Sequence, residues 1–277
     1  MANVVPPDAI ARFERIRFAD VEVDVAITDA SKSYWAEAAG GGWEPATLRF
    51  MARAIRPGTV FVDVGAWVGP LSLLAGKMGA AVIALEPDPV ARKELVANLT
   101  RNGIAADVKP AALHTDNIGM TLHAPEGFGR SVSTSFECGG DDGEPVATIS
   151  GEELAAAIKL ARQAVGGDAP VVFKVDIEGH EHLIGPALCD LWRRFDAELH
   201  LSLHPRSIWA QERAARGDLA ARWRAYKAMT SLLCAFRGGR IQVANAPSMP
   251  LKPACLFQAF RTPRPKNFTV EVGRPAR

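Results

Sequence analysis

The stretch FVDVGAWVGPLSLLAG (61–76) decides the fold. It predicts a buried strand, a glycine turn and a helix, because a continuous apolar run leads to Gly65 and Gly69 and then to apolar residues at helical spacing. The next stretch, IALEPDPVARKELVANLTRNG (83–103), predicts a second strand that ends on Glu86, followed by a second helix. Glu86 lies 21 residues after Gly65. This layout is typical of a unit that holds a nucleoside, with glycine backbone at one end and a carboxylate on the ribose diol at the other.

Strands and helices alternate outward from this unit, over about residues 59–205. The alternation predicts an α/β fold with a doubly wound, mostly parallel sheet of the Rossmann-like type. The further core elements that we expect are strands at 106–113, 119–125, 171–176 and 197–205 and a helix at 151–164. We expect three parts in the chain: an N-terminal lead-in (1–56), the ligand-binding core (57–205) and a C-terminal part (206–277).

The two flanking parts have weaker patterns. Alternating apolar and polar residues at 15–27 indicate a hairpin or edge strand, and Pro45 suits the first turn of a helix at 45–55. After the core, a long helix is expected at about 210–236, with a terminal hairpin at about 254–260 and 268–272. Both flanks are expected to complete the core domain and partly cap its site.

Composition limits the class of protein. The chain has 277 residues, 48% hydrophobic and 23% charged, which is typical of a protein that folds around a core. A formal net charge of +1 gives no reason to expect a nucleic-acid partner. The four cysteines have no metal-ligand spacing, and there is no secretion signal or membrane span, so we expect reduced thiols and a cytoplasmic location.

The glycine turn itself indicates which ligand fits. A dinucleotide site needs closely spaced glycines where the diphosphate approaches a helix N-terminus. Trp67 stands in this turn and would crowd a diphosphate, and Pro70 removes one amide from the helix end. A ligand with an amino-acid tail and no phosphate fits better. S-adenosylmethionine (SAM) is such a ligand: its ribose would pair with Glu86 and its ammonium with Asp63.

Several polar residues are expected around the same mouth of the sheet, because sites in open α/β sheets form at the carboxyl ends of the strands. Asp176 ends an apolar strand, where a carboxylate is costly without a partner, so it is a candidate acceptor contact or proton acceptor. Glu178 and His204 are candidates for binding the acceptor or taking its proton. The alternative for each is a structural role in capping the next turn. We considered a metal on these three residues and expect none.

The motifs that surround these residues are similar to those of one known family. DVGAWVG (63–69), EPDPVARKELVAN (86–98), FKVDIEGHE (173–181) and SLHP (202–205) resemble the signature elements of FkbM methyltransferases, which are class I SAM-dependent enzymes. FKVDIEGHE is the most specific of the four. The chain departs from the family pattern at Trp67, Pro70 and Ser202, where the family usually has Asn, an aromatic residue and Glu.

The resemblance implies a SAM-dependent O-methyltransferase whose acceptor is a hydroxyl of a sugar, glycan or secondary metabolite. With SAM as the cofactor, the residues expected to bind it are Glu44, Asp63, Gly65, Ala66, Trp67, Gly69, Glu86, Pro87 and Ala111. The catalytic residues would be Asp176, Glu178 and His204, and the substrate-binding residues Ser133, Thr134 and His180. The expected partner is a small molecule or glycan, with no nucleic acid and no membrane. Two alternatives stay open: an NAD(P)-dependent oxidoreductase and a catalytically silent SAM-binding protein.

Overall fold

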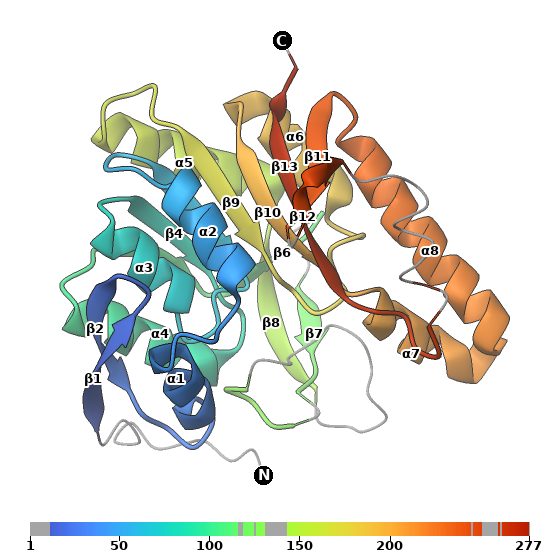
Figure 1. Ribbon diagram of the computed structural model, residues 1–277, viewed down its shortest axis with the longest axis horizontal. Helices are drawn as coiled ribbons and strands as arrows, with labels where there is room; N and C mark the ends of the chain where they lie inside the picture. The colour runs from blue at the N-terminus through green and yellow to red at the C-terminus, as the bar shows by residue number, and fades with distance from the viewer. Residues whose placement is uncertain are drawn as a thin grey trace.

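The central sheet has eight strands and confirms the predicted α/β class (Figure 1). The computed structural model describes residues 12–115, 119–124, 126–130, 143–244, 246–250, 260 and 262–276. In spatial order the strands are β12 (Ala246–Pro250), β11 (Gly239–Val243), β13 (Phe268–Pro275), β10 (Glu198–Leu203), β9 (Val171–Val175), β3 (Val60–Val64), β4 (Ala81–Leu85) and β5 (Ala106–Lys109). The run from β10 to β5 is parallel, and β13, β11 and β12 add an antiparallel edge.

The centre of the sheet is apolar on both faces, as the continuous hydrophobic runs predict. All five residues of β3 are buried, and so are four of the five in β4 and in β9. Strand register pairs Asp63 of β3 with Lys174 of β9 and with Ala84 of β4. The one carboxylate in β3 therefore lies beside a lysine, at the carboxyl end of the sheet.

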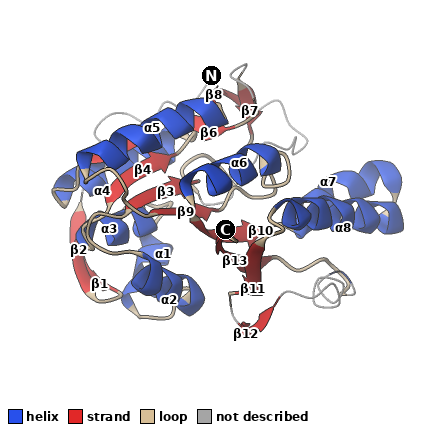
Figure 2. Cartoon of the chain, turned by 90° about the horizontal axis from the view of Figure 1, so that it is seen from above, coloured by secondary structure: helices blue, strands red, loops and turns tan. Residues whose placement is uncertain are grey.

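Helices cover both faces of this sheet, which makes it doubly wound (Figure 2). One face packs on α1 (Lys32–Ala39), α2 (Pro45–Ala54), α3 (Pro70–Lys77), α4 (Pro89–Arg101) and the hairpin of β1 (Phe13–Phe18) and β2 (Val21–Ala26). The other packs on α5 (Gly151–Ala164), α6 (Gly185–Phe195), α7 (Pro205–Arg216) and α8 (Asp218–Ala235). The helix at 151–164 and the hairpin at 15–27 are confirmed. The predicted helix at 45–55 is α2.

Two expected elements differ in the structure, and a third is described only in part. The strand at 106–113 is two strands, β5 and β6 (Ala111–Leu113), because Pro110 interrupts the ladder, and β6 joins β8 (Glu144–Ile149) and β7 (Met120–Leu122) in a separate small sheet. The helix at about 210–236 is two helices, since Gly217 breaks it with φ 76°. The expected strand at 268–272 is present as β13, which pairs with β10 and β11, whereas its expected partner at 254–260 lies outside the described residues except for residue 260.

Within the described residues, no helix has the length and apolar character needed to cross a membrane. The division of the chain at residues 56 and 205 stays a prediction.

Candidate functional site

A cavity of about 260 Å³ opens at the carboxyl ends of β3, β4 and β9. Residues expected to bind the cofactor line it, and they are Glu44, Asp63, Gly65, Ala66, Trp67, Glu86, Pro87 and Ala111. The candidate acceptor residues Asp176, Glu178 and His180 line the same cavity. Gly69 does not line it. Ser133 and Thr134 lie outside the described residues. The structure thus brings together the described cofactor and acceptor candidates apart from Gly69 and His204, which do not line the cavity.

The two glycines of the turn make close chain packing possible. Gly65 has φ 80°, and a Cβ added to it would lie 2.0 Å from the carbonyl oxygen of Asp176. Gly69 has φ 91°, and its Cβ would lie 2.4 Å from Leu95 of α4. Sequence reasoning assigned both glycines to close approach of a ligand. In the structure their missing side chains make room for the chain that follows β9 and for α4, and only Gly65 also faces the cavity.

Glu86 anchors one end of the cavity. Its side chain is buried and accepts the backbone N–H of Trp67 at 2.6 Å and that of Asp88 at 2.9 Å. Burial raises its pKa to about 7, against the opposing effect of these two hydrogen bonds. Each carboxylate oxygen keeps a further lone pair, so Glu86 retains acceptor capacity for a pair of hydroxyls.

Trp67 forms part of the cavity wall with a positive φ of 50°. Its indole N–H donates to the carbonyl of Gly129 at 2.8 Å, and its ring meets Tyr34 edge-on, with centroids 4.8 Å apart. These contacts hold the indole beside the turn. They place a large apolar side chain where a dinucleotide fold has a glycine.

Asp63 and Lys174 form a buried ion pair behind the turn. Asp63 Oδ2 accepts the hydroxyl of Ser72 at 2.7 Å, and Lys174 Nζ lies 3.6 Å from Oδ1. Lys174 also donates to the carbonyl of Gly65 at 2.9 Å and lies 3.9 Å from Asp176. The sequence predicted only the ammonium of the ligand as the partner of Asp63. In the structure Lys174 also lies beside Asp63 and balances its charge.

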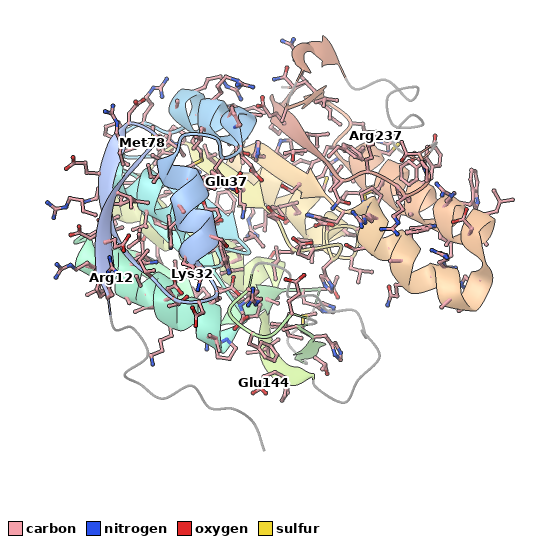
Figure 3. The ribbon with its side chains drawn as sticks, turned by 60° about the horizontal axis from the view of Figure 1, so that its bottom comes forward. Arg12, Lys32, Glu37, Met78, Glu144 and Arg237 are labelled. Atoms are coloured by element: carbon pink, nitrogen blue, oxygen red, sulfur yellow. The ribbon has the colours of Figure 1, made fainter. Side chains whose placement is uncertain are left out.

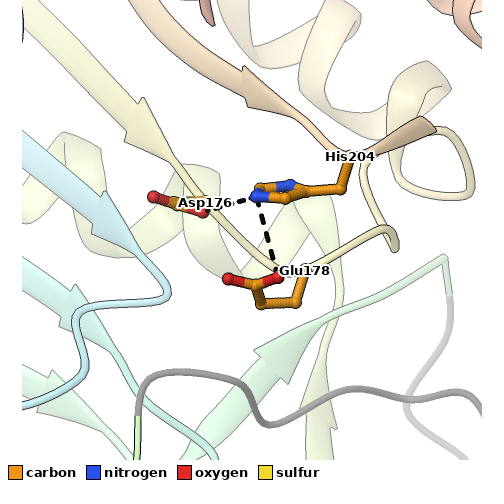
Figure 4. Close-up of side chains that lie close together, drawn as sticks. All are labelled: Asp176, Glu178 and His204. Atoms are coloured by element: carbon orange, nitrogen blue, oxygen red, sulfur yellow. Dashed lines mark ion pairs between the residues drawn. The ribbon is translucent and has the colours of Figure 1, made fainter. Parts of the chain in front are cut away.

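Three side chains converge at the acceptor end (Figure 4). His204 Nε2 lies 3.4 Å from Asp176 Oδ1 and 3.7 Å from Glu178 Oε2. Asp176 follows β9, Glu178 lies in the next turn, and His204 follows β10, so two adjacent parallel strands deliver the cluster. This confirms that the sheet topology places the three residues together, as their positions at strand ends predict.

A fourth residue, Glu181, holds the imidazole from behind. Its Oε1 lies 2.6 Å from His204 Nδ1, and the same oxygen accepts the backbone N–H of Gly179 at 3.1 Å. Burial alone would lower the pKa of His204, but the hydrogen bond to Glu181 and the nearby carboxylates outweigh it and raise the pKa to about 9. His204 is therefore protonated at neutral pH. In this form the imidazolium can donate a hydrogen bond and carry a positive charge, but it cannot act as a general base.

Glu178 has the properties of the better proton acceptor. Burial raises its pKa to about 7, although the charge of His204 opposes the shift. Its backbone has φ 53°, a left-handed conformation that a residue with a Cβ rarely adopts. The neighbouring His180 has a pKa lowered to about 4 by burial, so it faces the cavity as a neutral imidazole.

The cluster also has the donor atoms of a cation site. One ligand atom from each of Asp176, Glu178 and His204 lies within 4.8 Å of the others, a mixed oxygen and nitrogen set that divalent cations accept. The expectation that the site works without a metal stays a prediction.

Sequence reasoning assigned no site role to four residues that matter here. Glu181 ends the motif FKVDIEGHE, so the motif itself pointed to it. Lys174 lies two residues before Asp176 on the same face of β9, which strand alternation indicates. Tyr34 and Trp43 reach the cavity from the lead-in. Trp43 directly precedes the predicted cofactor residue Glu44, whereas no sequence pattern signals Tyr34.

Several known proteins are similar to this chain. A ribosomal protein L11 methyltransferase of Pelotomaculum thermopropionicum is 38% identical over 63 residues, which are 22% of this chain and 20% of that protein. The chain thus matches about a fifth of the length of this curated relative. An rRNA methylase from Streptococcus thermophilus has 11% identity and a TM-score of 0.43, covering 83% of this chain and 94% of that one. The 16S rRNA N2 G1207 methyltransferase of T. thermophilus, in complex with AdoMet and guanosine, has 12% identity and a TM-score of 0.40, covering 96% and 50%.

The curated relative contradicts the expected partner. It is named for a ribosomal protein, so the prediction of a small molecule or glycan as the acceptor is wrong. The expected absence of a nucleic-acid partner rested on the net charge of +1. This charge is a sum over the whole chain, and a sum does not show how the charges are distributed.

A family model identifies the protein family of the chain. The model described as the methyltransferase FkbM domain matches residues 63–225, more than half of the chain. The match begins at Asp63 of β3 and includes Asp176, Glu178, Glu181 and His204. The chain therefore belongs to the FkbM methyltransferase domain family.

Proposed function

We propose that this protein transfers a methyl group from SAM to an oxygen atom of a macromolecular substrate. The observation that carries the proposal is one cavity that is lined by Glu86 and by Asp176 and Glu178, the two carboxylates that His204 contacts. The family match and the named relatives support the reaction class, and the relatives support a macromolecule as the substrate.

The cavity residues fit SAM. Glu86 has unused lone pairs for the ribose hydroxyls, and Asp63 Oδ1 is buried without a hydrogen bond from the described residues, which suits the ammonium of the amino-acid tail. Lys174 borders the same region and suits the carboxylate of that tail. When bound, SAM supplies a methyl group on a sulfonium, which is already a good electrophile.

The chain's own task is then to position the acceptor and to take its proton. A hydroxyl loses its proton as the new C–O bond forms, so a proton acceptor is needed within hydrogen-bond reach. Glu178, with a pKa of about 7, is matched to this task near neutral pH. Asp176 orients the hydroxyl, and protonated His204 balances the charge of the two carboxylates.

The oxidoreductase alternative is less well supported. Trp67 fills the turn where a diphosphate would approach, and Pro70 at the first position of α3 removes a backbone donor there. A diphosphate needs both the space and the donors.

Calorimetry separates these functions first. The wild-type protein should bind S-adenosylhomocysteine (SAH) and not NADH. Glu86→Gln should weaken SAH binding by about tenfold to a hundredfold, as expected for loss of charged hydrogen bonds worth about 1.5–3 kcal/mol. Glu152→Gln on the exposed face of α5 is the matched control and should bind SAH like the wild type. Binding of NADH instead of SAH would overturn the proposal.

Transfer of a labelled methyl group from SAM tests the rest. Label should appear in the macromolecular fraction of a cell extract, and Glu178→Gln should reduce it at least a hundredfold while leaving SAH binding intact. Digestion and mass spectrometry of the product should place the methyl on oxygen. Tight SAH binding without label in any fraction would identify a silent binding protein.

A further inference from the structure

The charges of the chain are strongly segregated. Residues 205–277 contain 14 Lys and Arg but only 3 Asp and Glu, a formal charge of +11. Residues 1–204 contain 18 Lys and Arg and 28 Asp and Glu, a formal charge of −10. The net charge of +1 conceals this asymmetry. A basic segment of this size indicates a polyanionic partner.

The helices α7 and α8 carry much of this charge. They form a hairpin that projects beyond the end of the sheet (Figure 2), and nitrogen-tipped side chains surround it, with Arg237 just beyond α8 (Figure 3). The segment 262–267 lies against this hairpin. Arg222 donates to the carbonyl oxygens of residues 260, 262 and 263, and the side chain of Asn267 accepts the backbone N–H of Arg206. The cations of both segments therefore belong to one region.

Few acidic residues balance these cations. The hairpin contains only Glu212, paired with Arg216 and Arg224, and Asp218, paired with Arg222. Five other exposed cations make no ion pair with any described residue, and we call them the basic surface: Arg206, Arg213, Lys227, Arg264 and Lys266. Unpaired exposed cations remain available for phosphate groups.

An exposed aromatic ring lies within this region. Trp223 of α8 is 64% exposed, and its ring stacks on Tyr226 with centroids 5.8 Å apart and an interplanar angle of 24°. Tyr226 in turn meets Phe260 edge-on, with centroids 5.4 Å apart. The exposed indole of Trp223 is not part of the hydrophobic core that the structure describes. A ring that is supported from below and open above is suited to stacking on a nucleic-acid base.

The basic surface begins next to the candidate active site. His204 is the residue that precedes α7, and Arg206 is the second residue of that helix. A strand bound along α7 therefore has one end beside the residues that would receive the methyl acceptor.

We propose that the basic surface, together with Trp223, binds a single-stranded nucleic acid and presents it to the active site. The cations contact the phosphodiester backbone, and the indole stacks on one base. This inference rests on the proposed function for its purpose, but the binding itself is measurable without SAM. It names the substrate class that the methyl-transfer proposal leaves open.

The test measures binding of a labelled 12-nucleotide oligouridylate to the full chain by fluorescence anisotropy at several salt concentrations. We expect log Kd to rise linearly with log salt, with a slope of about 2 to 3.5 for three to five phosphate contacts. Lys227→Glu with Lys266→Glu should weaken binding at least tenfold and lower the slope by about 1.4. The control is Arg49→Glu with Lys159→Glu, two exposed cations of α2 and α5, which changes the net charge equally and should bind like the wild type.

A second pair of variants tests the stacking contact. Trp223→Ala should weaken oligouridylate binding about fivefold to a hundredfold, in line with about 1–3 kcal/mol per stacked base. Leu160→Ala, which removes a 68% exposed apolar side chain from α5, is the matched control. Polyglutamate, which has charges but no bases, should bind weakly and should not respond to Trp223→Ala.

Each contrary result overturns the proposal. Absence of oligouridylate binding at low salt, equal loss in the control pair, or equal affinity for polyglutamate would remove nucleic acid as the partner. Binding to phosphatidylglycerol vesicles in preference to oligouridylate would assign the surface to a membrane. SAH calorimetry on the same variants keeps the two proposals apart, since the basic-surface variants should bind SAH normally.

Discussion

Glu181 and His204 form a buried pair, with Oε1 of the carboxylate 2.6 Å from Nδ1 of the imidazole. Glu181 is completely buried, and its second oxygen has no hydrogen bond from the described residues. The pair joins the turn after β9 to the end of β10. It fixes the ring so that Nε2 points toward Asp176 and Glu178, and it keeps the ring protonated.

Glu181→Gln should therefore shift the pH profile of methyl transfer. In the wild type we expect activity to rise through about pH 7, as Glu178 ionises, and to fall through about pH 9, as His204 loses its proton. A neutral partner removes the charge that stabilises the imidazolium, so the alkaline limb should move down by about one unit or more.

The measurement is kcat/KM for methyl transfer from pH 5.5 to 10 for both proteins. Glu152→Gln, which changes an exposed carboxylate, serves as the control and should keep the wild-type profile. An alkaline limb that stays in place in Glu181→Gln would show that Glu181 has a purely structural role.

The stability of the protein should fall as the pH rises from 7 to 9.5. The pKa of His204 is about 9 in the folded state against 6.5 ordinarily, so its contribution is complete below about pH 6.5 and is lost as the pH rises through 9. Below pH 7 the effects oppose one another: Glu86 and Glu178, with pKa values raised from 4.5 to about 7, lose their contribution as the pH rises, while His180 and His200, with pKa values lowered from 6.5 to about 4, gain theirs. Urea unfolding should therefore give a lower free energy of unfolding at pH 9.5 than at pH 7. A constant value would contradict these shifts, and His204→Gln should flatten the step above pH 7.

Lys174→Met should destabilise the fold by about 3 kcal/mol, because it leaves the buried carboxylate of Asp63 without its cation. Adding Asp63→Asn to this variant removes the uncompensated charge and should recover part of the loss. A double-mutant cycle of urea unfolding measures the coupling between the two residues. Additive effects of the two substitutions would mean that the ion pair is not a functional unit.

Gly65→Ala should be much more damaging than Gly58→Ala. Both glycines have φ near 80°, but a Cβ on Gly65 would lie 2.0 Å from a backbone oxygen, whereas a Cβ on Gly58 has nothing within 4 Å. We expect about 1 kcal/mol for Gly58→Ala from backbone strain alone, and more than about 3 kcal/mol or failure to fold for Gly65→Ala. Equal free energies of unfolding would show that β9 does not pack closely on the turn.

The core of the fold was predictable from sequence because its signals are local. Continuous apolar runs identify β3, β4 and β9, and the helix at 151–164 has a capping box between Ser150 and Glu153. The features of the fold that the sequence did not predict depend on partners that are distant in sequence. β13 acquires its place by pairing with β10 and β11.

The candidate site also has features that the sequence predicted and features that it did not. Strand ends indicated Asp176, Glu178 and His204, since parallel strands bring their carboxyl ends to one edge. The pairing of Asp63 with Lys174 depends on strand register, and the raised pKa of His204 depends on Glu181 across the two motifs. Neither follows from residue spacing alone. The expected absence of a nucleic-acid partner was argued from the total charge of the chain, which conceals the formal charge of +11 on residues 205–277.

The decisive measurement is a crystal structure of the protein with SAH bound. We expect the ribose hydroxyls on Glu86, the amino-acid tail beside Asp63 and Lys174, and the sulfur facing Asp176 and Glu178. An empty cavity in the presence of saturating SAH, or SAH bound elsewhere on the protein, would contradict this expectation.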